Sequence, residues 1–177
     1  SDMGAPALAA GDLDDDRTAE IVLQRRIIAG TDLSREIEVL QYSATGLKSL
    51  WKQRFPGLGN ALAIGDVDGD RKAEIVTAGG SVVTVLKRRA DGGYESLAEL
   101  PNVSAQVTVV RVADVDRDGK PEIIASGTSG RVTVYKPRKV GDRDYFAVIW
   151  QSRHLISDTL APSGPGGRSS AAQSMDC

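Results

Sequence analysis

The strongest constraint on the fold of this chain is an internal repeat. Three segments align without a gap, at residues 11–22, 65–76 and 113–124. Each is a short acidic loop that runs directly into a Glu-Ile-Val or Glu-Ile-Ile triplet. Self-similarity at a period of roughly 20 to 50 residues is typical of proteins that copy one supersecondary unit along the chain. We therefore expect three copies of one structural unit.

Each repeat contains four short apolar runs with the composition of β-strands. The runs are rich in Val and Ile, often alternate apolar with polar residues, and are bounded by Gly, Asp, Asn and Ser. Four strands in a repeat of this length are typical of a propeller blade. The sequence thus predicts an all-β protein with three four-stranded blades, at about residues 5–54, 60–100 and 106–151.

The segments outside the blades are expected to contribute little to the fold. Residues 1–4 are expected to be an artificial leader or disordered, and they show no signal peptide. Residues 152–177 form a C-terminal segment that is low in complexity from about residue 161. Inside the first repeat, residues 25–34 are additional, and we expect them to form a loop between the second and third strands.

Three blades are fewer than a closed ring needs, since complete propellers have about four to eight. We expect a partial β-propeller, which is either part of a larger ring or a half-ring completed by oligomerisation. Trp51 and Trp150 end matching strands of the first and third repeats. Packing between blades explains these tryptophans better than stacking on sugars.

The repeated loops hold more than half of the 24 acidic residues of the chain. Carboxylates fall at positions 1, 3, 5 and 9 of each loop. They are Asp12, Asp14, Asp16 and Glu20; Asp66, Asp68, Asp70 and Glu74; and Asp114, Asp116, Asp118 and Glu122. Four carboxylates in one tight turn repel one another unless a cation neutralises them. The loops are therefore candidate cation sites.

Calcium suits this donor set best, because it takes about six to eight oxygen ligands in a flexible geometry. Each loop offers four carboxylates and a backbone carbonyl, which we assign to Thr18, Lys72 and Pro121. About three calcium sites are expected. Magnesium is the second choice because it demands a stricter octahedral geometry. Zinc and copper prefer His or Cys ligands, and the loops contain neither.

An EF-hand is the main alternative for an acidic loop of this kind. It would place a bidentate Glu at position 12 and flank the loop with helices. Position 12 is Leu23, Thr77 or Ala125 here. The acid at position 9 leads straight into a predicted strand, which favours a strand–loop–strand site.

The three segments resemble the calcium loops of FG-GAP and VCBS repeats, which occur in integrin-alpha-type propellers and many bacterial surface proteins. In that family the pattern is Asp-x-Asp-x-Asp-Gly-x-x-Asp, in the hairpin between the first two strands of a blade. Gly119 keeps the glycine of position 6, whereas Arg17 and Arg71 replace it. If this position needs a positive φ angle, the two arginines are strained and their sites are weaker.

The resemblance implies a calcium-binding module of a secreted or surface protein, located outside the cell or on its surface. Such a module mediates adhesion or the binding of a protein or glycan. Two alternatives remain open: the propeller portion of a polysaccharide-acting enzyme, and a pure assembly scaffold. We find no catalytic motif and expect no enzymatic activity.

The composition argues against two other classes of partner. Lys and Arg total 22 against 24 Asp and Glu, which gives a net charge of -2, and aromatic residues make up only 5%. A nucleic-acid-binding protein is usually strongly basic, so no nucleic-acid partner is expected. No apolar stretch approaches the length of a membrane span, so no membrane insertion is expected.

Overall fold

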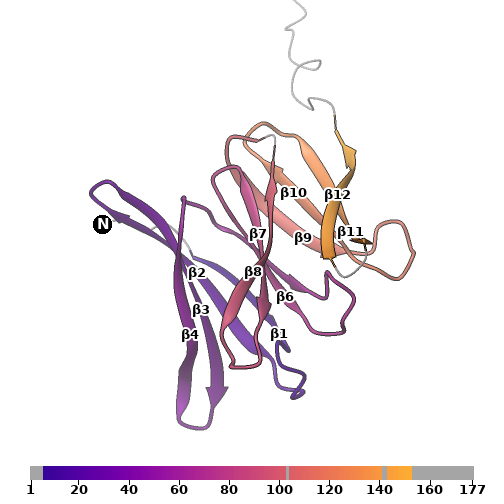
Figure 1. Ribbon diagram of the computed structural model, residues 1–177. Coiled ribbons are helices and arrows are strands. Elements are labelled where there is room, and N and C mark those ends of the chain that lie inside the picture. Colours follow the sequence, from indigo (N-terminus) through magenta and orange to yellow (C-terminus); the bar gives the residue numbers. More distant parts are fainter. Residues whose placement is uncertain (1–5, 103, 141–142, 153–177) are drawn as a thin grey trace, which may run out of the picture.

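The computed structural model describes residues 6–102, 104–140 and 143–152. In these ranges every regular element is a β-strand, as predicted (Figure 1). They contain no helix with the length and apolarity to cross a membrane. The leader at 1–4, the segment from 153 with its low-complexity part, and the isolated His154 and Cys177 lie outside the described residues.

The twelve strands form three antiparallel sheets of four strands, and each sheet follows chain order. The first sheet contains β1 (Ala7–Gly11), β2 (Glu20–Ala29), β3 (Asp32–Ser43) and β4 (Gly46–Pro56). The second contains β5 (Ala61–Gly65), β6 (Glu74–Gly79), β7 (Val82–Arg88) and β8 (Tyr94–Pro101). The third contains β9 (Val107–Ala113), β10 (Glu122–Gly127), β11 (Val132–Val140) and β12 (Arg143–Gln151). The predicted fold class is confirmed.

The blades are arranged around their first strands. β1 contacts β5, and β5 contacts β9, so the second blade lies between the other two (Figure 1). None of the three sheets closes on itself in the described part of the chain. Blade-like sheets that share a row of inner strands are the organisation of a propeller.

Glycine permits the close approach of the inner strands. Gly11 ends β1 and Gly65 ends β5. A β-carbon at Gly65 would lie 2.5 Å from Val112 Cγ1 on β9, and one at Gly11 would lie 3.0 Å from Ile64 Cγ2 on β5. Each of these glycines removes the side chain at the point where the next blade packs.

Two apolar cores fill the spaces between the blades. The core between the first and second blades includes Val22, Ile37 and Leu86, and the core between the second and third includes Val76, Val110 and Ile123. The middle sheet supplies residues to both cores. For that reason all six residues of β6 are buried, whereas the buried residues alternate along the start of β2. A strand covered on both faces needs small or apolar residues at every position.

The same irregularity recurs in the third strand of every blade. The pairing of the third and fourth strands shifts between Val39 and Leu40, between Val85 and Leu86, and between Val134 and Tyr135. A shift of this kind bends the strand and redirects the side chains that follow. The three sheets are therefore copies of one another in detail, and residues of one blade can be compared directly with those of the next.

The prediction of a loop at residues 25–34 is wrong. β2 and β3 stay paired through most of this segment, from Arg25 opposite Glu36 to Ala29 opposite Asp32. Arg25 Nη2 lies 2.8 Å from Glu36 Oε1 and 2.5 Å from Glu38 Oε2 on the partner strand. Gly30 (φ 62°) reverses the chain in a tight turn. Cross-strand charge pairs and one turn glycine thus extend the hairpin instead of ending it.

Candidate metal centre

Each acidic loop connects the first two strands of its blade, the position that the sequence predicts. The loops run from β1 to β2, from β5 to β6 and from β9 to β10. Their ends are held together by β-pairing, because Gly11 lies opposite Glu20, Gly65 opposite Glu74, and Ala113 opposite Glu122. This pairing brings the aspartate of position 1 close to the glutamate of position 9.

The backbone of each loop is left-handed at positions 4 and 6. The φ angles are 65° at Asp15 and 68° at Arg17, 82° at Gly69 and 72° at Arg71, and 63° at Arg117 and 84° at Gly119. Position 6 therefore needs a positive φ in all three loops. Arg17 and Arg71 adopt a conformation that favours glycine, and Arg117 does so at position 4 of the third loop.

The aspartate of position 1 fixes this backbone. Its Oδ2 accepts the N–H of position 6 in every loop: Arg17 to Asp12 at 2.8 Å, Arg71 to Asp66 at 2.9 Å, and Gly119 to Asp114 at 2.9 Å. Desolvation opposes ionisation of Asp12, but the N–H groups of Arg17 and Asp15 lower its pKa overall. The backbone conformation of these loops is therefore stabilised by their own carboxylates, without the help of a bound ion.

The glutamate of position 9 is buried in all three loops. Glu20 and Glu74 are 1% exposed, and Glu122 is fully buried. One carboxylate oxygen accepts the N–H of position 2: Leu13 to Glu20 at 3.0 Å, Val67 to Glu74 at 2.9 Å, and Val115 to Glu122 at 3.0 Å. The longer side chain of Glu is needed to reach back across the hairpin. The second oxygen differs between the loops: Glu122 Oε1 accepts a bond from Lys136, whereas Glu20 Oε1 has no partner among the described residues.

One carbonyl assignment from the sequence is shifted by a residue. The N–H of position 7 donates to the aspartate of position 5: Thr18 to Asp16 at 2.7 Å, Lys72 to Asp70 at 2.8 Å, and Lys120 to Asp118 at 3.0 Å. The counterpart of Thr18 and Lys72 in the third loop is therefore Lys120. Pro121, which we assigned, follows it by one residue.

Three carboxylates converge in each loop. The groups are Asp12, Asp14 and Glu20; Asp66, Asp68 and Asp70; and Asp114, Asp116 and Glu122. Within each group one ligand oxygen from every residue lies within 4.8 Å of the others. Oxygens bound to one calcium ion at about 2.3–2.6 Å cannot lie much further apart than this. Asp16, Glu74 and Asp118 are predicted ligands that these groups do not include.

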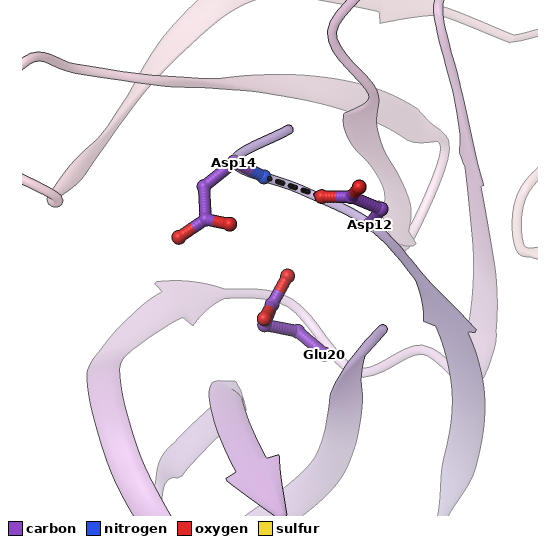
Figure 2. A group of neighbouring side chains, drawn as sticks. All are labelled: Asp12, Asp14 and Glu20. Carbon is purple, nitrogen blue, oxygen red and sulfur yellow. Dashed lines mark hydrogen bonds between the residues drawn. The ribbon is translucent and has the colours of Figure 1, made fainter. Parts of the chain in front are cut away.

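In the first loop, two oxygens in this group lack partners. The carboxylates of Asp12, Asp14 and Glu20 face a common space (Figure 2). Asp14 Oδ1 and Glu20 Oε1 are buried, and neither has a hydrogen-bond partner among the described residues. Burial, followed by the charges of Asp14, Asp16 and Asp12, raises the pKa of Glu20. Unpartnered buried carboxylate oxygens are costly unless a cation meets them, so this loop fits a bound cation.

The second loop already contains a cation. Lys87 on β7 reaches into it, and its Nζ lies 2.8 Å from Asp70 Oδ2 and bonds Asp68 Oδ2. Partial burial opposes the charge of Lys87, but the bonds to Asp68 and Asp70 raise its pKa overall. Burial also raises the pKa of Glu74 to about 8.

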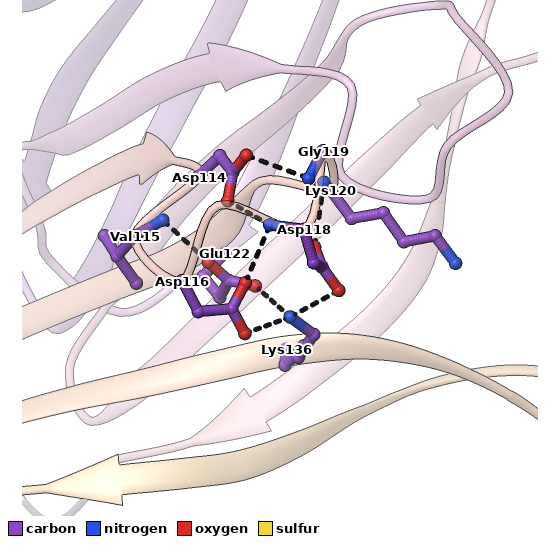
Figure 3. A network of polar contacts seen from close by, with 8 residues as sticks. All are labelled: Asp114, Val115, Asp116, Asp118, Gly119, Lys120, Glu122 and Lys136. Atoms are coloured by element: carbon purple, nitrogen blue, oxygen red, sulfur yellow. Dashed lines mark hydrogen bonds and ion pairs between the residues drawn. The ribbon is translucent and has the colours of Figure 1, made fainter.

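The third loop likewise holds the ammonium group of a lysine (Figure 3). Lys136 Nζ on β11 lies 2.8 Å from Asp118 Oδ2 and 2.9 Å from Glu122 Oε1, and it bonds Asp116 Oδ2. The bonds to Asp116 and Asp118 raise the pKa of Lys136. The donor set of these two loops therefore fits a cation, but an ammonium group occupies the position.

No role was predicted for Lys87 and Lys136 from the sequence. Lys87 lies in a basic run at the end of a strand, where a solvated side chain is the ordinary expectation. The available signal was the alignment of the repeats, because Lys87 and Lys136 each follow the third apolar run by one residue. Their contact with the acidic loop depends on the bend in the third strand, and no local sequence pattern predicts this bend.

The fold and the three hairpins define a repeat protein made of propeller blades with acidic loops. Residues 66–125 match the family model of the FG-GAP-like repeat. The matched stretch begins at the first aspartate of the second loop and includes the whole third loop. The predicted resemblance is confirmed for that stretch. A search among curated proteins found no match for the chain.

Proposed function

We propose that this chain is a calcium-stabilised β-propeller module of a secreted or surface protein, and that it binds a protein or a glycan. The observation that carries the proposal is one acidic hairpin at the same place in three blades, two of them within the FG-GAP-like match. FG-GAP-like repeats form a structural, generally non-catalytic fold and typically occur in extracellular or surface proteins. This supports a binding role rather than an enzymatic one.

Calcium would act on the fold and not on a reaction. The carboxylates of positions 1, 3, 5 and 9, with the carbonyl of position 7, would hold it. The bound ion would neutralise charges that otherwise repel one another across a tight turn. Because the unfolded chain has no such site, the free energy of calcium binding would add to the free energy of unfolding.

A pocket between the second and third blades supports a ligand-binding role. It has a volume of about 310 Å³ and lies between the second acidic loop and β11–β12. Its lining combines the exposed cations Lys120 and Arg138 with Tyr145 and Phe146. Tyr145 is 45% exposed. Cationic side chains can hydrogen-bond the hydroxyl or acidic groups of a glycan or a protein, and an aromatic ring beside them can stack on the same ligand.

Calorimetry with chelator-treated protein tests the metal role. Calcium is added with magnesium as the control, and the melting temperature is followed in parallel. We expect heat from calcium binding and a higher melting temperature with calcium than with magnesium. Absence of calcium heat at millimolar ion would contradict the proposal.

The ligand surface is tested separately. Wild-type protein and the Tyr145→Ala variant are compared on a glycan array and against extracellular protein extracts, both in calcium. We expect the variant to lose signal for the ligand that the wild type retains. Equal signal for both proteins would place the ligand elsewhere on the surface.

A further inference from the structure

The second and third blades have a lysine where the first has a glutamine. In the third strands of these two blades, the regular pairing ends at Val85 and at Val134, where the shift begins. Lys87 and Lys136 each lie two residues after that point. The shift in the first blade follows Val39, which makes Gln41 the equivalent residue. The carboxylates at positions 1, 3, 5 and 9 are the same in all three blades, but the residue that follows the shift in the third strand is charged only in the second and third blades.

The two lysines are placed as a bound ion would be. The side chain of Lys136 is 4% exposed, and its ammonium group bonds three loop carboxylates, those of Asp116, Asp118 and Glu122. Lys87 is 29% exposed and bonds Asp68 and Asp70. An ammonium group has three donors and no acceptor, so it can satisfy several carboxylates at once. It also adds the positive charge that the loop requires.

In the first loop, by contrast, the buried carboxylates are not fully paired by the described residues. Glu20 is 1% exposed, and its carboxylate points toward Asp12 and Asp14 (Figure 2). Its Oε1 has no hydrogen-bond partner within the described ranges, and neither has Asp14 Oδ1. A buried carboxylate oxygen without a partner is rare in folded proteins. This oxygen is a second observation, independent of the acidic composition, that points to a cation as its ligand.

Arg88 from the second blade does not bond these two oxygens. Its Nη2 lies 3.1 Å from the other oxygen of Asp14, Oδ2. Asp14 Oδ1 and Glu20 Oε1 therefore have no partner in the described part of the chain. The guanidinium group reduces the charge of the first loop but does not occupy its centre.

We infer that Lys87 and Lys136 replace the metal cation in the second and third loops, and that calcium binds the first loop. This inference rests on the proposed calcium-binding function and restricts it to one of the three loops. The second and third loops are then folded without calcium. Calcium controls only the first hairpin and the blade to which it belongs.

The stoichiometry of calcium binding tests the inference. Calorimetry on the full chain should give about one site for the wild type. Lys87→Gln and Lys136→Gln remove the resident ammonium groups, so each should add one site, and the double variant should approach about three. Each variant should also melt at a lower temperature without calcium and recover with it. Lys48→Gln removes an exposed charge on β4 and should leave the stoichiometry unchanged.

The reverse substitution is the second test. Gln41→Lys supplies the first loop with the side chain that closes the other two. It should abolish the calcium site of the wild type and raise the melting temperature in the absence of calcium. Because this variant gains a charge pair, its test does not depend on a destabilised protein.

The outcomes separate this inference from the proposed function. Three sites of similar affinity in the wild type would overturn the inference and leave a calcium-binding propeller module in place. A calcium site that persists in Gln41→Lys would also overturn it. No calcium binding by the wild type or by any lysine variant would overturn the proposed function itself.

Discussion

Arg71 shows how a single residue carries strain in these loops. Its φ angle is 72°, at the position where the third loop has Gly119 with φ 84°. Side chains disfavour this region by about 1–2 kcal/mol. The interaction that holds Arg71 there is its backbone N–H bond to Asp66, which any residue except proline could make. The side chain of Arg71 is therefore not needed for the loop conformation.

We predict that Arg71→Gly raises the free energy of unfolding by about 0.5–1 kcal/mol, because it relieves this strain at some cost in unfolded-state entropy. Chemical denaturation measures the change. Arg71→Gln is the matched control, since it removes the same charge and keeps the strain, and it should not stabilise. A loss of stability in Arg71→Gly would show that the arginine side chain itself supports the loop.

Tyr94 is a residue whose environment makes stability depend on pH. It is 5% exposed, and its ring centroid lies 4.8 Å from that of Trp51 on the neighbouring blade. Burial raises the pKa of Tyr94 to about 12, against a smaller opposing effect of Arg88. The folded protein therefore keeps the phenol proton in a pH range where the unfolded chain releases it.

We predict that the stability contributed by neutral Tyr94 is complete below pH 10 and is lost as the pH rises from 10 towards 12. The unfolded state binds fewer protons than the folded state in this range, so the free energy of unfolding falls with rising pH. The loss is at most about 2 to 3 kcal/mol. Denaturation of wild type and Tyr94→Phe at several pH values checks this. The variant should show the shallower decline, and parallel curves would contradict the assignment.

At the scale of elements, Gln24 is a buried polar side chain that joins the first two blades. Gln24 on β2 is fully buried, and its Nε2 donates to the carbonyl of Gly59 at 2.7 Å. Thr77 Oγ1 on β6 donates to Gln24 Oε1 at 2.5 Å. The equivalent residue in the second blade is the apolar Ala78, so this polar contact is not part of the repeat.

We predict that Gln24→Met lowers the free energy of unfolding by about 1–3 kcal/mol, because it leaves the Gly59 carbonyl and the Thr77 hydroxyl buried without their partner. Thr77→Val in the same background should cost less than it does in the wild type. A double-mutant cycle measures this coupling. Gln53→Met, at an exposed position of β4, is the control and should change stability little. Additive effects would show that the two side chains act independently.

At the scale of the whole molecule, the two predicted inter-blade tryptophans differ. Trp51 packs against Phe55 and Tyr94 in the core between the first and second blades. Trp150 is 54% exposed on β12, beside Ile149 and Val148, which are also exposed. The third blade thus presents exposed apolar side chains on β12, which is an edge strand of its sheet. Exposed apolar groups of this size usually mark an interaction surface.

We predict that the chain self-associates at micromolar concentration through this surface, so that its mass in solution exceeds 18.7 kDa. Sedimentation measures the mass as a function of concentration. Trp150→Glu should shift it towards the monomer, whereas Tyr42→Glu, at another exposed aromatic residue, should not. A monomeric mass for the wild type together with cooperative melting would contradict the prediction.

Features that depend on short, repeated stretches of the chain could be predicted from the sequence. Alternating apolar runs and turn residues define strands because side chains of a strand point to opposite faces. The acidic loops and their place in each blade could be predicted for the same reason. The strain at position 6 followed from the loop pattern, since Gly119 marks the position where Arg17 and Arg71 also need a positive φ. The segment 25–34 was misjudged because its hairpin depends on cross-strand pairs.

Which charges meet in the loops depends on how the strands pair and pack, and could not be predicted from the sequence. Lys87 and Lys136 reach the carboxylates from the third strand, after a shift in pairing that turns their side chains, and Gln24 finds Thr77 on another blade. Contacts of this kind depend on register and on the packing of separate strands, which leave no periodic trace in the sequence. The same packing buries Glu20 with no partner for Oε1 among the residues that the structure describes. Burial makes an unpaired charge costly, so it distinguishes the first loop from two others with the same carboxylates.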